Sequence, residues 1–291
     1  MNRAAIFGLF LLLIFSLAAQ AGPKGYLLII GGGERTDAIM KRFLNLAAGF
    51  GRGKIIIFTM ATEVPGEVGE EVMAEYKGRS VRDFSIHHLT RREALLPDTI
   101  KILDGAGGIF FTGGDQSRLT GVLLDTPLLE GIRDLYEKGG VIGGTSAGAA
   151  VMSEVMITGD EKRTSDEDEL WQAIWADNVV WTKGFGFVKN AIIDQHFLTR
   201  RRLNRLISLV IENPKLVGVG IEESTAVLVR PDGRYEVIGE NQVMIYDARR
   251  AKTYKSPTNH LGVQGMIMHV LLPGDVFDPL EGRVDGSTQR P

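Results

Sequence analysis

The chain has 291 residues and no cysteine, so disulfides cannot stabilise its fold and its N-terminus cannot carry a cysteine-linked lipid anchor. Its stability must come from a buried core, which 44% hydrophobic residues in a chain of this length can supply. The sequence also contains no internal repeat, no low-complexity tract and no linker that would divide its main part. We therefore expect an ordinary globular domain.

Positive charge is not in excess either, because 33 Lys and Arg residues stand beside 36 Asp and Glu residues, for a net charge of −3. Proteins that bind nucleic acids use a surplus of Lys and Arg to neutralise phosphates, so we expect no nucleic-acid partner. No cluster of histidine or carboxylate side chains has the spacing of metal ligands. We expect neither a metal ion nor another cofactor.

Residues 1–21 have the composition of a secretory signal peptide. Arg3 precedes an uncharged apolar run, and the run ends in Ala19-Gln20-Ala21, whose small residues suit a signal peptidase. The alternative is an uncleaved membrane anchor, because the apolar run of 18 residues just reaches the length of about 18 that spans a bilayer. The Ala-x-Ala end favours cleavage. We therefore expect a secreted or periplasmic protein with one mature domain, residues 22–291, and no membrane contact after cleavage.

From Gly25 onward, short apolar runs such as "GYLLII", "GKIIIF" and "VIGG" alternate with helix-like segments. Continuous apolar strands separated by amphipathic helices are typical of a parallel sheet covered on both faces. We predict a doubly wound, mostly parallel α/β sheet with a β-rich C-terminal extension, including a helix over residues 200–213 and a hairpin around residues 231–233. Between Thr158 and Lys183 the period fails, and this charged, tryptophan-containing stretch is interpreted as an insertion.

The stretch from Gly144 to Gly148 reads G-T-S-A-G and fits the nucleophile-elbow pattern. An ordinary glycine-rich turn between a strand and a helix would give a similar pattern. However, an apolar run precedes the stretch and "AAVM" follows it, which supplies the required strand–turn–helix setting. We predict Ser146 as a nucleophile, with backbone N–H groups of Ala147 and of Gly114 in "FFTGGDQ" as oxyanion donors.

A serine nucleophile needs a base and an orienting carboxylate. The chain has five histidines, namely His87, His88, His196, His260 and His269. His196 is favoured because it ends a predicted strand, where parallel strands deliver side chains to a binding crevice. Glu222 and Glu223 follow another short apolar run, and only one of two adjacent extended residues can point toward His196. The spacing does not choose between them, and a solvated Glu-Glu turn is the alternative.

Four motifs in this order, "FFTGGDQSRL", "GGTSAGA", "DQHFLTRRRLNRL" and "GVGIEESTA", resemble the family of serine hydrolases that includes cyanophycinase and peptidase E. The resemblance covers nearly the whole chain after the signal peptide. It implies a class I glutamine-amidotransferase-like fold and a catalytic triad of Ser146, His196 and Glu223. It also leaves open a homodimer like that of the family.

The resemblance implies cyanophycin as the substrate, a polyaspartate whose β-carboxylates carry arginine, and the β-aspartyl-arginine dipeptide as the product. The family's substrate contacts fall at Gln116, Asp194, Gln195, Arg200, Arg202 and Arg205. Arginine side chains bind carboxylates bidentately, which suits an aspartyl polymer. Three arginines at this spacing cannot all share one helical face, and a solvated basic helix face is the alternative interpretation.

Two other functions remain open. One is a peptidase-E-like aspartyl dipeptidase that uses the same triad on aspartyl peptides, and the other is a catalytically idle, exported binding protein with the same fold. The insertion between Thr158 and Lys183 does not match the family residue by residue. One hypothesis is that its acids, Asp166, Glu167, Asp168 and Glu169, pair with guanidinium groups of the substrate. The alternative, a charged mobile loop, is favoured.

Overall fold

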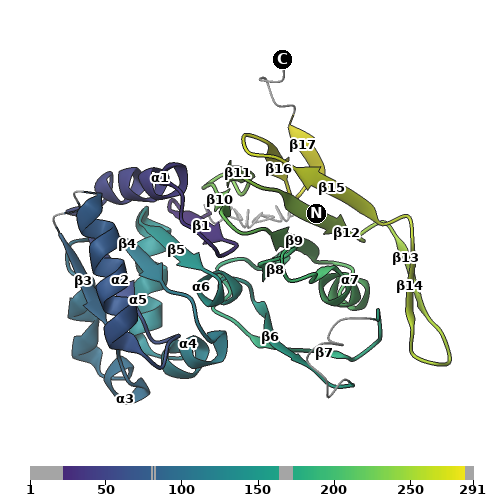
Figure 1. The fold of residues 1–291 in the computed structure, drawn as a ribbon, viewed down its shortest axis with the longest axis horizontal. Coiled ribbons are helices and arrows are strands. Elements are labelled where there is room, and N and C mark those ends of the chain that lie inside the picture. Colours follow the sequence, from purple (N-terminus) through teal and green to yellow (C-terminus); the bar gives the residue numbers. More distant parts are fainter. Residues whose placement is uncertain (1–21, 80, 82, 164–172, 286–291) are drawn as a thin grey trace, which may run out of the picture.

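The computed structural model describes residues 22–79, 81, 83–163 and 173–285 (Figure 1). Five of the described strands run parallel and form one part of a large central sheet. In their order across the sheet they are β1 (Tyr26–Ile30), β5 (Val141–Thr145), β4 (Ala106–Phe111), β2 (Lys54–Phe58) and β3 (Phe84–His87). Parallel neighbours need crossover connections, and helices supply them here.

Each face of the parallel strands packs against its own group of helices, because successive side chains of a strand point to opposite faces. Leu28 and Ile30 of β1 pack with the apolar sides of α1 (Asp37–Ala48) and α2 (Pro65–Gly78). Leu27 and Ile29 belong to a larger core on the opposite face. The helices that contribute to that core are α3 (Arg91–Ala94), the 3₁₀ helix η1 (Pro97–Leu103), α4 (Gln116–Leu123), α5 (Pro127–Lys138) and α6 (Ala147–Ala150).

Antiparallel strands from the C-terminal half extend the central sheet beyond β1. In order they are β10 (Thr225–Val229), β11 (Tyr235–Gly239), β16 (Val276–Asp278) and β17 (Arg283–Asp285). β10 and β11 pair across a tight turn in which the N–H group of Gly233 donates to the carbonyl of Arg230. The predicted hairpin is therefore confirmed.

A second sheet lies beside the central one and contains four of the strands that the structure describes (Figure 1). In order they are β15 (Ile267–Leu271), β12 (Val243–Asp247), β9 (Val217–Ile221) and β8 (Ala191–Gln195). β8 and β9 are parallel, and α7 (Leu203–Glu212) connects them and packs on them. Two antiparallel ribbons complete the described part, β6 (Val155–Glu161) with β7 (Val179–Lys183) and β13 (Lys252–Lys255) with β14 (Leu261–Gln264).

The fold class predicted from the sequence, a mixed α/β domain with a β-rich C-terminal part, is confirmed. The predicted helix over residues 200–213 begins later, at Leu203. The chain first makes a turn in which Arg201 adopts φ 54°, a conformation that an α-helix cannot continue. Arg200 and Arg202 therefore lie before α7, and only Arg205 of the three arginines lies within it.

Two sequence predictions concern segments that the structure leaves undescribed. The predicted signal peptide, residues 1–21, and the four acids of residues 166–169 both lie outside the described residues. The described ends of the insertion form the ribbon of β6 and β7. Within the described ranges, no helix is long and apolar enough to cross a membrane.

The core between the sheet and α1 yields a stability prediction. Phe110 is 1% exposed, and its ring centroid lies 5.4 Å from that of Phe43 and 6.3 Å from that of Tyr76. Replacing it by alanine leaves a cavity among these rings, so Phe110→Ala is expected to lower the free energy of unfolding by about 3–5 kcal/mol. Urea denaturation measures the change. Leu280→Ala, at a side chain that is 75% exposed, is the control, and equal losses for the two variants would contradict the packing.

Candidate active site

Ser146 lies in a strained turn directly after β5. Its backbone has φ 53° and ψ −110°, and α6 begins at the next residue. The two glycines of the motif leave room for this turn. A Cβ atom at Gly144 would lie 2.2 Å from the carbonyl oxygen of Gly148, and one at Gly148 would lie 2.3 Å from that of Phe111. The strand–turn–helix geometry expected from the G-x-S-x-G pattern is therefore present, with the serine at its apex.

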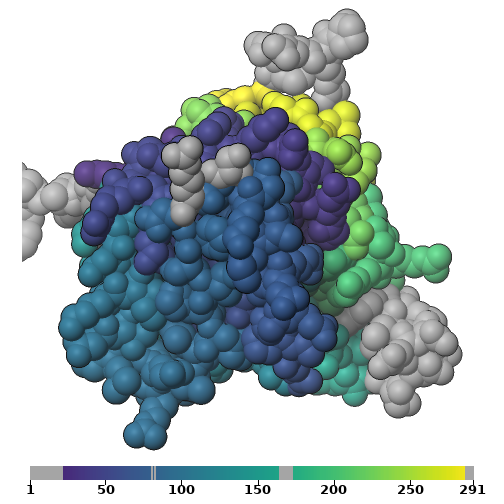
Figure 2. All heavy atoms as spheres, turned by 60° about the vertical axis from the view of Figure 1, so that its left-hand side comes forward, coloured from purple at the N-terminus to yellow at the C-terminus, as the bar shows by residue number. Residues whose placement is uncertain are grey.

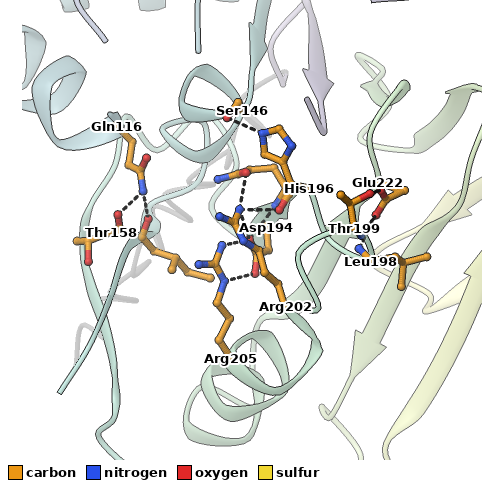
Figure 3. Close-up of polar contacts among 12 residues, drawn as sticks. Gln116, Ser146, Thr158, Asp194, His196, Leu198, Thr199, Arg202, Arg205 and Glu222 are labelled. Carbon is orange, nitrogen blue, oxygen red and sulfur yellow. Dashed lines mark hydrogen bonds and ion pairs between the residues drawn. The ribbon is translucent and has the colours of Figure 1, made fainter. Parts of the chain in front are cut away.

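His196 follows β8 and brings its ring between Ser146 and Glu223; Figure 3 shows the contact with Ser146. Its Nε2 lies 2.9 Å from Oγ of Ser146, and its Nδ1 is hydrogen-bonded to Oε1 of Glu223. A proton on Nδ1 satisfies the carboxylate, which leaves Nε2 as an acceptor for the serine hydroxyl. This arrangement can remove the hydroxyl proton when Oγ attacks a carbonyl group.

Three consecutive carbonyl groups at the end of β1 fix the segments that carry these side chains. The carbonyl of Ile30 accepts from the N–H group of Ser146 at 3.1 Å. The carbonyl of Gly31 accepts from His196 at 2.7 Å, and that of Gly32 accepts from Ser224 at 2.9 Å. Ser146, His196 and Ser224 all have φ between 47° and 54°, a conformation that costs a non-glycine residue about 1–3 kcal/mol. These hydrogen bonds hold each strained residue in place.

The glycines that follow β1 also shape the site, although none of the motifs above includes them as site residues. Gly32 has φ 110°, and a Cβ atom there would lie 2.2 Å from Cε1 of His196. A Cβ atom at Gly33 would lie 2.8 Å from Cβ of Glu223. The His196–Glu223 pair therefore fits only because these positions lack side chains. Three successive glycines after the first strand were the available signal.

Glu222 and Glu223 have separate contacts. Glu223 reaches His196, whereas the buried Glu222 accepts hydrogen bonds from the N–H group of Leu198 and from both the N–H and hydroxyl groups of Thr199 (Figure 3). Burial alone would raise the pKa of Glu222, but hydrogen bonds from Thr199 and from neighbouring backbone groups lower it below its ordinary value. The spacing left open which of the two glutamates orients His196, and the geometry favours Glu223.

The surroundings of His196 keep its ring neutral over a wider pH range. Burial lowers the pKa of His196 below its ordinary value of 6.5, and the positive charges of Arg200 and Arg202 lower it further. The hydrogen bond that His196 donates to Glu223 raises this pKa, without reversing the shift. At neutral pH the ring can therefore accept a proton from Ser146.

Asp194 and Arg205, two of the predicted substrate contacts, form a buried ion pair. Nε of Arg205 donates to Oδ2 of Asp194 at 2.7 Å, Nη2 donates to Oδ1, and the two side chains are only 2% and 1% exposed (Figure 3). Their contact with substrate stays a prediction, and in the structure their charged groups are buried against each other. The pair instead ties α7 to β8, two residues before His196.

Gln116, Gln195 and Arg202 also make contacts within the protein. The amide nitrogen of Gln116 donates to the carbonyl of Ile157 at 2.9 Å and to that of Thr158, so it holds β6. Nη1 of Arg202 donates to the backbone oxygen and to Oε1 of Gln195 at 2.8 and 2.6 Å. Burial, followed by the charge of Arg205, lowers the pKa of Arg202 to about 10, so the side chain stays protonated at neutral pH.

Arg200 differs from the other predicted contacts because its side chain is exposed. It lies in the turn after His196, where its N–H group donates to the carbonyl of His196 at 2.9 Å. Its charge also acts on the imidazole of His196. Arg200 is thus the predicted contact best placed to meet a ligand.

The predicted oxyanion donors lie around Ser146. A Cβ atom built on Gly113 would lie 3.9 Å from Oγ of Ser146, which makes Gly113 the nearer of the two glycines after β4. Gly114 has φ 134°, and a Cβ atom there would meet the carbonyl of Ala61 at 2.3 Å. Ala147 is the first residue of α6, where the N–H groups lack helical partners. The donor roles of Gly114 and Ala147 remain predictions.

A cleft opens at Ser146 and His196. Its lining further includes Thr112 and Gly113 after β4, Gly33 and Arg35 before α1, and Val68 and Glu71 on α2. Figure 2 shows the face over α1 and α2, with green residues from the C-terminal half along its right-hand edge. Among the described residues, no group of three or more histidine or acidic side chains could hold a metal ion.

The site has the architecture of a hydrolase: an α/β sheet carries a serine at a strand-to-helix turn, and a histidine–carboxylate pair lies against that serine. The model of peptidase family S51 matches residues 27–237, and the chain belongs to this family. The protein is therefore a peptidase, as the four motifs predicted.

Two curated relatives are cyanophycinases. The chain is 34% identical to that of Nostoc sp. over 265 residues, which are 87% of this chain and 85% of the relative. It is 34% identical to that of Geminocystis herdmanii over 280 residues, which are 90% of this chain and 98% of the relative. Among solved structures, a peptidase from an acI-B1 Actinobacterium has a TM-score of 0.65 at 22% identity and covers 89% of this chain and 98% of its own. The last similarity supports the fold.

The buried ion pair gives a prediction that separates a structural contact from a substrate contact. Asp194→Ala is expected to lower the free energy of unfolding by about 3–5 kcal/mol, because the guanidinium of Arg205 stays buried without this carboxylate. Asp134→Ala is the control, since its ion pair with Lys138 has side chains that are 71% and 70% exposed and such pairs contribute at most about 1 kcal/mol. Unchanged stability of Asp194→Ala with a raised KM would contradict the structural role and favour the substrate contact.

Proposed function

We propose that the protein is a serine-type exopeptidase with Ser146 as nucleophile, His196 as general base and Glu223 as the orienting carboxylate. The hydrogen-bonded order of Glu223, His196 and Ser146 carries this proposal. Nε2 of His196 takes the hydroxyl proton as Oγ attacks the scissile carbonyl, and then gives it to the leaving amine as the peptide bond breaks. Water next attacks the acyl-enzyme with His196 as base, which releases the acid product and restores Ser146.

The tetrahedral intermediate carries a negative charge that needs preorganised donors. We assign this role to the backbone N–H groups of Ala147 and Gly114. The supporting observations are the position of Ala147 at the start of α6 and the closeness of Gly113 to Ser146. Removing one such donor typically reduces transition-state stabilisation by about 2.7–4 kcal/mol.

The proposed substrate is cyanophycin, which the enzyme would degrade to β-aspartyl-arginine. Support comes from two relatives named cyanophycinase, each 34% identical over most of both chains. The exposed Arg200 beside His196 adds a guanidinium group that can bind carboxylates of the polymer. The composition of residues 1–21 supports export, so that the polymer would be taken from outside the cell.

Product analysis tests the reaction and the nucleophile together. Purified protein and its Ser146→Ala variant are incubated with insoluble cyanophycin, and the soluble products are identified by mass spectrometry. We expect β-aspartyl-arginine from the unaltered protein only, because the variant lacks the attacking oxygen. An intact polymer together with cleavage of short peptides that begin with aspartate would instead favour the aspartyl dipeptidase. No cleavage and no labelling of Ser146 by a fluorophosphonate would favour the binding protein.

The pH dependence of Ser146 labelling tests the role of His196. Protonated His196 cannot act as a base, so the fluorophosphonate reaction rate is expected to rise with pH through an inflection below 6.5, since burial lowers this pKa. Glu223→Gln removes a group that raises the same pKa, so the inflection should move to lower pH while the plateau rate falls roughly 10²–10⁴-fold.

Glu130→Gln is the charge-matched control for Glu223→Gln, because its side chain is 69% exposed on α5. It should leave both the inflection and the plateau rate unchanged. An inflection above 7 in the unaltered protein, or one that stays in place in Glu223→Gln, would contradict the proposed base and its partner.

A further inference from the structure

The cleft at Ser146 continues into a charged groove along α2. The two hollows share Gly33, Arg35 and Glu71, and the groove is completed by Glu34, Glu75 and Arg79. Three carboxylates and two guanidinium groups therefore line it. Because negative charge is in excess, the groove favours a cationic group that enters from the cleft.

The two arginines of the groove are already engaged by Glu75. Nε of Arg35 donates to Oε2 of Glu75 at 2.9 Å, and Nη2 of Arg35 contacts the same oxygen. Arg79 approaches Oε1 of Glu75 at 3.5 Å and Oδ1 of Asp37 at 3.3 Å. The side chains of Arg35 and Glu75 are only 17% and 13% exposed, so this ion pair forms the largely buried base of the groove.

Glu71 is the carboxylate of this groove that also lines the catalytic cleft. Its side chain is 72% exposed, and Nη2 of Arg35 lies 3.7 Å from its Oε1, which is beyond hydrogen-bond distance. It lies one helical turn before Glu75 on α2, next to the apolar wall residue Val72. The carboxylate of Glu71 can therefore accept hydrogen bonds from a ligand without breaking an existing one.

A positive charge lies close to the imidazole ring of His196, which lines the same cleft. Arg200 follows His196, its side chain is exposed, and its charge reaches the imidazole ring. An arginine joined to an aspartate through its α-amine keeps both a free carboxylate and a free guanidinium group. Glu71 in the lining of the cleft and Arg200 near His196 carry the charges that match both groups of such a unit.

We propose that Glu71 is a specificity-determining residue that binds the guanidinium group of the substrate's arginine through its two carboxylate oxygens. As a statement about the reaction, this rests on the proposed function, but the binding event can be measured without turnover. The proposal gives α2 the role that was hypothesised for the acids of residues 166–169, which lie outside the described residues.

Ligand binding by the full chain with Ser146→Ala, which cannot turn over the ligand, provides the test. Isothermal titration calorimetry compares β-aspartyl-arginine with β-aspartyl-citrulline, because citrulline keeps the shape of arginine and lacks its charge. The arginine ligand should bind about tenfold more tightly, as expected for a hydrogen-bonded charge pair. Adding Glu71→Gln should reduce this ratio to less than about twofold.

Glu70→Gln is the matched control, because Glu70 is an exposed neighbour on α2 that is not part of the lining of either hollow. It should keep the tenfold ratio. The proposal is overturned if Glu71→Gln keeps the ratio, if both ligands bind the parent protein equally, or if neither binds. Cyanophycin turnover by protein with intact Ser146 is measured separately. If cyanophycin is not turned over but the arginine ligand still binds about tenfold more tightly in a Glu71-dependent way, the proposed reaction is refuted and the proposed binding site is retained.

Discussion

The end of β1 is the constraint on which the rest of the site depends. The carbonyl groups of its last residue, Ile30, and of the two glycines that follow accept the N–H groups of Ser146, His196 and Ser224 in turn. These residues come from three different connections, one after a strand of the central sheet and two after strands of the second sheet. A single short segment thus sets the distances among the nucleophile, the base and the carboxylate.

The same segment explains why strained backbone is tolerated here. Ser146, His196 and Ser224 each have positive φ, which costs free energy in any non-glycine residue. The hydrogen bonds to β1 offset that cost, and Gly32 and Gly33 leave room for the imidazole ring and its carboxylate partner. Because rotation of any one of these residues would break a hydrogen bond, the side chains are preorganised before a ligand binds.

The sequence predicted those features that depend on local pattern. Ser146 could be identified because its glycine neighbours and the flanking strand and helix are consecutive in the chain, and His196 because it ends an apolar run. The choice between Glu222 and Glu223 depends on the turn at Leu198 and Thr199, whose N–H groups bind Glu222. The assignment of β8 and β9 to a second sheet likewise depends on long-range pairing with β12. Neither feature has a local signature.

The pairing of charged residues likewise has no local signature in the sequence, and their exposure indicates which of them can meet a charged ligand. The family resemblance predicts that Asp194 and Arg205 contact substrate, and no local pattern showed that they pair with each other. A buried charge is costly unless it is paired, and these two side chains form an ion pair across eleven positions. Groups that meet a charged ligand must instead be exposed, so that their charge remains solvated until the ligand arrives. Glu71, in the lining of the cleft, and Arg200, whose charge acts on His196, are both exposed. The buried pair of Asp194 and Arg205 instead ties α7 to β8.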